Sequence, residues 1–193
     1  MNVEKIKKII TDLLLEIGEN PDREGLKQTP SRIAKMCVEL FRGYDVQNYP
    51  KIATFQNNNE NTIIYDSGNY YSLCEHHMLP FFGKYVFAYK PNPKGKIIGL
   101  SKIARIINFL AAKLELQENL ASEIIQNIEI ALKDEQYPPL GMAIYLKGRH
   151  LCKEMRGVHQ RGEMVTIKVT GCFEEPQQKN EFLQTIKNID NEL

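Results

Sequence analysis

Hydrophobic residues repeat at helical spacing near the N-terminus and predict two helices there. Aliphatic side chains recur every three or four positions over residues 3–17, which is typical of an amphipathic helix. A second such segment covers residues 29–41, and Pro30 stands in its first turn, where proline is well tolerated. We therefore expect a helical arm over residues 1–45, followed by a separate domain over residues 46–193.

The pattern changes after residue 61 to alternating, β-branched and aromatic positions, which favour strands. Two short strands, 62–65 and 70–73, are separated by residues 66–69 (Asp-Ser-Gly-Asn), which are typical of a turn. Further strands are predicted at 83–90, 142–146 and 166–173.

Two more helices fall between these strands. Ser101 is a suitable N-cap for the first, and the second covers residues 117–133. A C-terminal helix follows at 181–191. The order over residues 62–173 is strand, strand, helix, helix, strand, strand, which predicts an α+β fold. Because two helices cover only one face of a four-stranded sheet, the other face and the sheet edges need partners, and the pattern predicts an oligomer.

Composition and charge exclude several classes of protein. The chain has 193 residues, of which 42% are hydrophobic, and its formal net charge is +1. This hydrophobic fraction supports a folded core, and the balanced charge argues against a general nucleic-acid-binding protein. No apolar run approaches the ~18 residues that a membrane span needs, and the N-terminus does not resemble a signal peptide. We expect a cytoplasmic protein with neither a nucleic-acid nor a membrane partner.

One short segment, Cys74-Glu75-His76-His77, concentrates side chains that bind metals or carry protons, although the whole chain has only four Cys and four His. Cys74 and His77 have the three-residue spacing of a short metal-binding loop. Side chains three apart in a strand point to opposite faces, so the backbone must turn tightly for both to bind one ion. That turn leaves His76 beside the metal with a ring nitrogen available for proton transfer.

A third ligand must come from elsewhere in the chain. Cys37 and Cys172 fall in a predicted helix and a predicted apolar strand, so both are interpreted as small core residues. Cys152 lies in a second cluster of His, Cys and Arg, and in extended backbone it points to the same side as His150. Cys152 can complete a Cys-His-Cys site, and His150 can then approach His76 across the metal. Three ligands with one open position are typical of catalytic zinc, and separate thiols with surface histidines are the alternative.

Several charged residues remain ambiguous from spacing alone. Arg32 and Lys35 share one helix face, which is typical of a solvated surface. Lys102 and Arg105 lie near the start of a predicted helix, where they suit either a phosphate site or an ordinary exposed helix end. Glu118 lies in the first turn of the next helix, where a carboxylate also suits the helix dipole.

These motifs occur in a fixed order along the chain, and together they resemble the GTP cyclohydrolase I family. The resemblance spans roughly residues 20–185, and it departs from the family pattern over 159–166, where members carry a Ser/Thr-rich stretch. The motifs that carry it are Glu24-Gly25-Leu26-Lys27-Gln28-Thr29-Pro30-Ser31-Arg32-Ile33-Ala34-Lys35, Cys74-Glu75-His76-His77, Gly99-Leu100-Ser101-Lys102-Ile103-Ala104-Arg105-Ile106, Gln117-Glu118, His150-Leu151-Cys152 and Met155-Arg156-Gly157-Val158.

The resemblance implies a tunnelling fold, in which an antiparallel four-stranded sheet carries two antiparallel helices on one face. Residues 46–193 would form this catalytic domain, which includes the C-terminal helix. Subunits of this family join their sheets into a pentameric barrel, and two pentamers usually stack into a decamer. The active site of the family lies between subunits, so the residues of one site need not come from one chain.

The resemblance also implies the reaction, which converts GTP and water to 7,8-dihydroneopterin triphosphate and formate, the first step of tetrahydrofolate and pterin biosynthesis. It implies that Cys74, His77 and Cys152 bind Zn²⁺. The other matching residues are two acid–base histidines (His76, His150), two residues beside the reacting groups (Ser101, Gln117), a carboxylate on the guanine edge (Glu118) and a cationic clamp on the triphosphate (Lys102, Arg105, Arg156, Arg32, Lys35).

Three other functions can be compared with these motifs. A zinc-dependent nucleobase deaminase needs a Cys-x-x-Cys motif, which the sequence does not contain. A related tunnelling-fold enzyme, such as a deazaguanine nitrile reductase, uses a cysteine nucleophile, whereas Cys74 is followed by paired histidines that suit metal ligation better. A non-catalytic oligomer that binds purines or pterins around a structural zinc is the third alternative.

Overall fold

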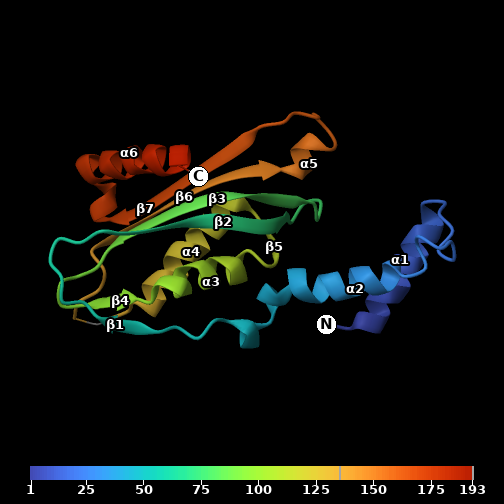
Figure 1. Ribbon diagram of the computed structural model, residues 1–193, viewed down its shortest axis with the longest axis horizontal. Coiled ribbons are helices and arrows are strands. Elements are labelled where there is room, and N and C mark those ends of the chain that lie inside the picture. The colour runs from blue at the N-terminus through green and yellow to red at the C-terminus, as the bar shows by residue number, and fades with distance from the viewer. Residues whose placement is uncertain (135, 193) are drawn as a thin grey trace.

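The computed structural model describes residues 1–134 and 136–192, and its centre is a five-stranded sheet (Figure 1). The strand order is β5-β2-β3-β6-β7. Four strands pair antiparallel: β2 (Ile64–Cys74), β3 (Pro80–Lys90), β6 (Gly141–His150) and β7 (Glu163–Gly171). The two-residue strand β5 (Leu114–Glu115) adds a parallel edge beside β2, and a separate two-stranded sheet joins β1 (Thr54–Gln56) to β4 (Lys96–Ile98). The predicted α+β class is confirmed. The predicted four-stranded sheet lacks β5, which is too brief to leave a pattern, and the separate pair β1 and β4 was not predicted.

Helices α3 (Leu100–Leu110) and α4 (Gln117–Ala131) cover one face of the large sheet, as predicted (Figure 1). Strand alternation explains this packing, because Tyr85, Phe87 and Tyr89 of β3 all point into the core beneath the helices. The intervening Val86 and Ala88 point to the other face. The two faces of one strand therefore belong to two different hydrophobic clusters.

Helix α6 (Pro176–Glu192) packs on that second face (Figure 1). The sequence predicts that this face needs a partner subunit, but a helix of the same chain covers part of it. Phe182 of α6 is fully buried against Val86, Ala143 and Phe173. The helix follows β7 directly, after the short 3₁₀ turn Cys172–Glu174, and folds back over the sheet.

Helices α1 (Val3–Glu16) and α2 (Thr29–Leu40) pack on each other and extend beyond one end of the sheet (Figure 1). Two 3₁₀ turns, Arg42–Tyr44 and Val46–Asn48, lead from α2 to β1. Both helices lie where the periodicity predicts them. Within α1 and α2, Leu14 and Ala34 are the buried residues.

The predicted turn at residues 66–69 is wrong, because β2 runs through it without interruption. Its backbone pairs with β3 from Asp66↔Phe87 to Asn69↔Lys84. The Tyr85 hydroxyl also donates a hydrogen bond of 2.7 Å to Asp66 Oδ2 across the strands. Hydrogen bonding along a long partner strand therefore outweighs the local turn preference of these polar residues.

The predicted N-cap at Ser101 is also wrong. Helix α3 begins at Leu100, its N-cap is Gly99, and no side chain caps its first turn. Ser101 instead lies in that first turn with its side chain exposed. Gly99 is held by its backbone N–H, which donates to the carbonyl of Ala53.

Candidate metal centre and active site

The turn between β2 and β3 places two of the predicted ligands together. The N–H groups of His77 and Met78 both donate to the carbonyl of Cys74, at 3.3 and 2.8 Å. Met78 closes the turn in the left-handed region, with φ 55°. The tight turn that the Cys74–His77 spacing requires is therefore confirmed.

The third ligand reaches the site from a helix rather than from a strand. Strand β6 ends at His150, and the short helix α5 (Leu151–Glu154) follows at once. The expected extended backbone from His150 to Cys152 is therefore wrong. The Arg149 guanidinium fixes this corner by donating two hydrogen bonds to the Glu154 carboxylate, at 2.9 and 2.6 Å.

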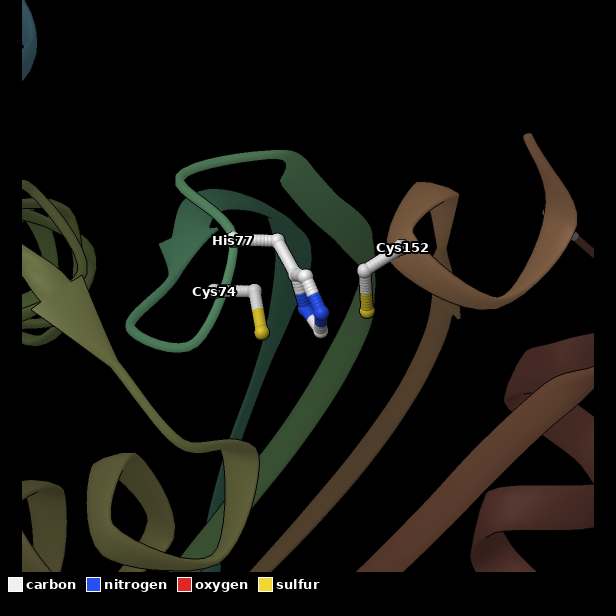
Figure 2. Close-up of side chains that lie close together, drawn as sticks. All are labelled: Cys74, His77 and Cys152. Carbon is white, nitrogen blue, oxygen red and sulfur yellow. The ribbon is translucent and has the colours of Figure 1, made fainter. Parts of the chain in front are cut away.

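The ligand atoms of Cys74, His77 and Cys152 lie within 4.8 Å of one another, and Figure 2 shows the imidazole between the two thiols. Two atoms bound to one zinc ion lie at most about 4.6 Å apart, so small side-chain movements suffice for a shared ion. Burial and the adjacent Cys74 thiol raise the pKa of Cys152, since two neighbouring thiolates repel each other. A divalent cation removes that repulsion, so the donor set fits zinc. Cys37 and Cys172 are half-buried and lie outside this group.

Arg156 lies beside the metal group. Its guanidinium donates a 2.5 Å hydrogen bond to Nε2 of His77. Both side chains are exposed, so this cation stands at the open side of the site. Among the described residues, it is the one member of the predicted phosphate clamp that hydrogen-bonds a candidate metal ligand.

His76 lies next to the metal group without belonging to it. Its side chain is 62% exposed, and its Nε2 is 4.0 Å from a Glu75 carboxylate oxygen. The His76 and His77 rings stand nearly perpendicular, with centroids 6.2 Å apart. No hydrogen bond or ring contact among the described residues joins His76 to His150, so the expected approach of the two rings is not seen within one chain.

His150, by contrast, is held from two sides. Its ring stacks on Phe81 of β3, with centroids 4.7 Å apart and an interplanar angle of 3°. Its Nε2 lies 3.0 Å from Oε1 of Gln117, in the first turn of α4. Burial lowers the pKa of His150, and Lys153 also lowers it, whereas the nearby Glu118 carboxylate raises it.

Two residues of this region escape sequence reasoning. The Tyr70 hydroxyl donates to the same Gln117 oxygen at 2.9 Å, and both side chains are buried. Gly148 makes room for this contact, because a Cβ there would collide with the Tyr70 hydroxyl and lie 2.5 Å from Gln117 Oε1. The one available signal is that Gly148 precedes His150 by two residues and so shares its face of the strand.

The remaining predicted site residues are exposed or half-buried. Ser101, Lys102 and Arg105 lie along the first half of α3, and Glu118 is exposed in the first turn of α4. Arg32 and Lys35 are exposed on α2. Among the described residues, no hydrogen bond or ion pair joins either of these two cations to the metal group.

Over residues 1–134 and 136–192, every helix is too short or too polar to span a membrane.

A family model described as GTP cyclohydrolase I matches residues 6–187. The chain belongs to the GTP cyclohydrolase I family. The match covers nearly the whole chain, and it confirms the prediction of an enzyme of this family.

Named relatives agree with this membership. The GTP cyclohydrolase 1 of Alkalilimnicola ehrlichii is 43% identical over 188 residues, which cover 95% of this chain and 98% of that protein. The GTP cyclohydrolase 1 of Thermoanaerobacter pseudethanolicus is 43% identical over 188 residues, with 96% of each chain covered. The bifunctional protein FolKE of Lactococcus lactis subsp. cremoris is 40% identical over 187 residues, which cover 94% of this chain and 52% of that protein.

Among solved structures, the apo crystal structure of the archaeosine synthase QueF-Like gives a TM-score of 0.39 at 12% identity. The alignment covers 57% of this chain and 96% of that one. The GTP cyclohydrolase I assignment rests on the sequence matches.

Proposed function

We propose that this protein is a zinc-dependent GTP cyclohydrolase I that converts GTP and water to 7,8-dihydroneopterin triphosphate and formate. This reaction would make it the first enzyme of tetrahydrofolate and pterin biosynthesis. The observation that carries the proposal is the Cys74–His77–Cys152 group, three soft ligands with an open side, in a chain of this family. The four unpaired cysteines suit a reducing compartment, so we expect the enzyme to act in the cytoplasm.

Cys74, His77 and Cys152 would hold the zinc ion. When bound there, a zinc ion supplies a Lewis acid that makes water nucleophilic near neutral pH. The chain holds its three ligands on two elements, the β2–β3 turn and α5, which are fixed to each other through the pairing of β3 with β6. The open side of the group, where Arg156 lies, is the side from which an anionic substrate would approach.

Two histidines, His76 and His150, would carry the proton transfers. Ring opening, formate loss, ribose rearrangement and ring closure all require protons to be moved. His76 is exposed beside the candidate metal ligands, where a substrate could reach its ring. His150 is half-buried and held in one orientation by Phe81 and Gln117. We assign proton transfer at the exposed side of the site to His76, and proton transfer from a ring held in one orientation to His150.

Substrate binding would use charged and polar residues from α2, α3 and α4, and Arg156, which follows α5. Glu118 would accept hydrogen bonds from the guanine amino edge, since a carboxylate pairs well with two N–H donors. Ser101 would lie beside the ribose and the reacting groups. The triphosphate would be held by the cations Lys102, Arg105, Arg156, Arg32 and Lys35.

Neither alternative function has an observation in its favour. A tunnelling-fold nitrile reductase needs a free cysteine nucleophile, but both thiols near His150 belong to the candidate metal group. A binding protein with structural zinc would need a closed, four-ligand site, and three ligands are found among the described residues.

The decisive experiment incubates the zinc-loaded protein with GTP and measures formate and the fluorescence of the oxidised pterin. We expect one formate per pterin, and absence of both products would refute the proposed function. His76→Ala should keep its zinc and lose roughly 10²- to 10⁴-fold in turnover, the usual contribution of a general acid or base. The matched control is His159→Asn, because His159 is exposed at φ 49° and asparagine tolerates that conformation.

A further inference from the structure

The amide of Gln117 can be oriented from its surroundings. Its side chain is 1% exposed and makes five hydrogen bonds, so each amide atom has a defined set of partners. On one side the partners are the main-chain carbonyls of Leu146 and Met164, at 3.3 and 3.1 Å, and the Thr166 hydroxyl at 3.0 Å. Carbonyl oxygens have no hydrogen to donate, so the NH₂ group of the amide must face them.

The opposite orientation of the amide is excluded by repulsion. It would place the Gln117 oxygen against two carbonyl oxygens in the protein interior, where an unsatisfied acceptor costs about 1–3 kcal/mol. Oε1 therefore faces His150 and Tyr70. The Tyr70 hydroxyl donates to it, and this second donor holds the oxygen in place.

An amide oxygen accepts hydrogen bonds and cannot donate one. The His150 nitrogen 3.0 Å from it must therefore carry the hydrogen. We propose that Gln117 is a positioning residue that fixes neutral His150 with its hydrogen on Nε2, so that Nδ1 is the ring nitrogen that exchanges protons with the substrate. In the hydrogen bonds among the described residues, Nδ1 of His150 has no partner.

Packing explains how a glutamine reaches this place. Gly148 and His150 share one face of β6, and the missing side chain of Gly148 leaves the space that Gln117 Oε1 and the Tyr70 hydroxyl fill. The Phe81 ring stacks on the His150 ring and fixes the plane of the imidazole. The inference rests on the proposed function for the identity of the substrate, whereas the tautomer itself follows from the hydrogen bonds.

The test reads the tautomer directly. Zinc-loaded protein is labelled with ¹⁵N in its four histidines, and the His150 signals are assigned by their loss in His150→Asn. At about pH 8, where an ordinary imidazole is neutral, Nε2 of His150 should show the shift of a protonated nitrogen and Nδ1 that of an unprotonated one. A proton on Nδ1 in the unaltered protein would overturn the proposal.

Variants separate positioning from substrate contact. Gln117→Met should mix the tautomers and lower kcat roughly 10- to 100-fold, as loss of a partner that orients an imidazole does, with KM for GTP unchanged. Tyr70→Phe should keep the tautomer and lose less activity, because Leu146 and Met164 still orient the amide. Tyr85→Phe is the control, since its buried hydroxyl binds Asp66 instead and both readouts should stay unchanged.

Two results would contradict the role of Gln117. Gln117→Met with an unchanged tautomer would show that the amide does not set it. A raised KM with unchanged kcat would place the amide against the substrate. If the unaltered protein forms no formate from GTP, the proposed function fails, but the tautomer measurement needs no turnover and still decides the inference.

Discussion

At the scale of single residues, Cys152 is the proposed metal ligand on which the candidate site depends most. Cys74 and His77 come from one turn, whereas Cys152 closes the group from α5. Cys152→Ser should weaken zinc binding by at least about tenfold, because two ligands on one turn do not define a stable site. Zinc per chain, measured after exposure to a competing chelator, tests this.

Cys37→Ser is the matched control, since Cys37 is also half-buried but lies on α2, outside the metal group. It should keep the zinc content of the unaltered protein. Cys152→Ser protein that retained as much zinc as this control would show that Cys152 is not a ligand.

Residue chemistry explains which parts of the site can be predicted from the sequence. Cys74, His77 and Cys152 are rare residue types at metal-binding spacing, so they can be found without a structure. Tyr70 and Gly148 cannot, because a tyrosine in a strand is ordinary and a glycine carries no reactive group. Their contacts with Gln117 arise where β2, β6 and α4 meet, which local sequence does not encode.

At the scale of elements, helical periodicity predicts more reliably than turn-forming residues do. The helices α1, α2 and α4 lie where repeated aliphatic residues predict them, to within two residues. Helix α6 is predicted over 181–191 but begins five residues earlier, at Pro176. Strand β2 differs, because the polar residues 66–69 alone favour a turn, whereas beside β3 they form part of a continuous strand. Pairing partners distant in sequence decide such segments, and a local pattern cannot include them.

The β2–β3 pair also gives a prediction about pH and stability. Burial raises the pKa of Asp66, although the hydrogen bond from Tyr85 partly lowers it. A carboxyl whose pKa is higher in the folded chain binds more protons when the chain is folded. The folded state therefore loses stability as the pH rises through and above 3.8, the ordinary pKa of an aspartate. Asp66→Asn removes this loss, and its amide oxygen can still accept from Tyr85.

The expected result is a melting temperature that varies less with pH for Asp66→Asn than for the unaltered protein. The gain in melting temperature from the substitution should be larger at about pH 7 than at about pH 3.5, where the carboxyl is mostly protonated in both the folded and the unfolded chain. Thermal unfolding followed by circular dichroism at the two pH values measures it. A difference that is larger at the lower pH would contradict the assigned direction of the pKa shift.

At the scale of the whole molecule, the exposed surface of the arm indicates association. Ile9, Leu13, Leu15 and Ile17 of the first helical segment are each at least 52% exposed, which is costly for a chain alone in water. The edge strand β7 likewise has β6 as its one partner in the sheet. We expect the family's decamer, with sheets joined into a barrel, and sedimentation should then report about ten times 22.3 kDa.

An oligomer of this kind makes a prediction about shared sites. Within one chain, Arg32 has no hydrogen bond or ion pair to the described metal group, and we predict that it binds the triphosphate in a neighbouring subunit's site. Arg32→Glu and Cys152→Ser subunits are each expected to be nearly inactive. When the two are mixed equally, about one quarter of the sites combine an intact metal group with an intact Arg32 from the neighbour.

Mixed oligomers, prepared by coexpression with two different tags and purified through both, should therefore recover up to about a quarter of the GTP-dependent formate release. The unmixed variants, purified in the same way, set the baseline. If Arg32 acts in its own chain's site, every site in the mixture carries one defect, and activity stays at that baseline. Mixed oligomers without recovered activity would thus assign Arg32 to its own subunit or remove it from the site, and recovery would show that one active site is built from two chains.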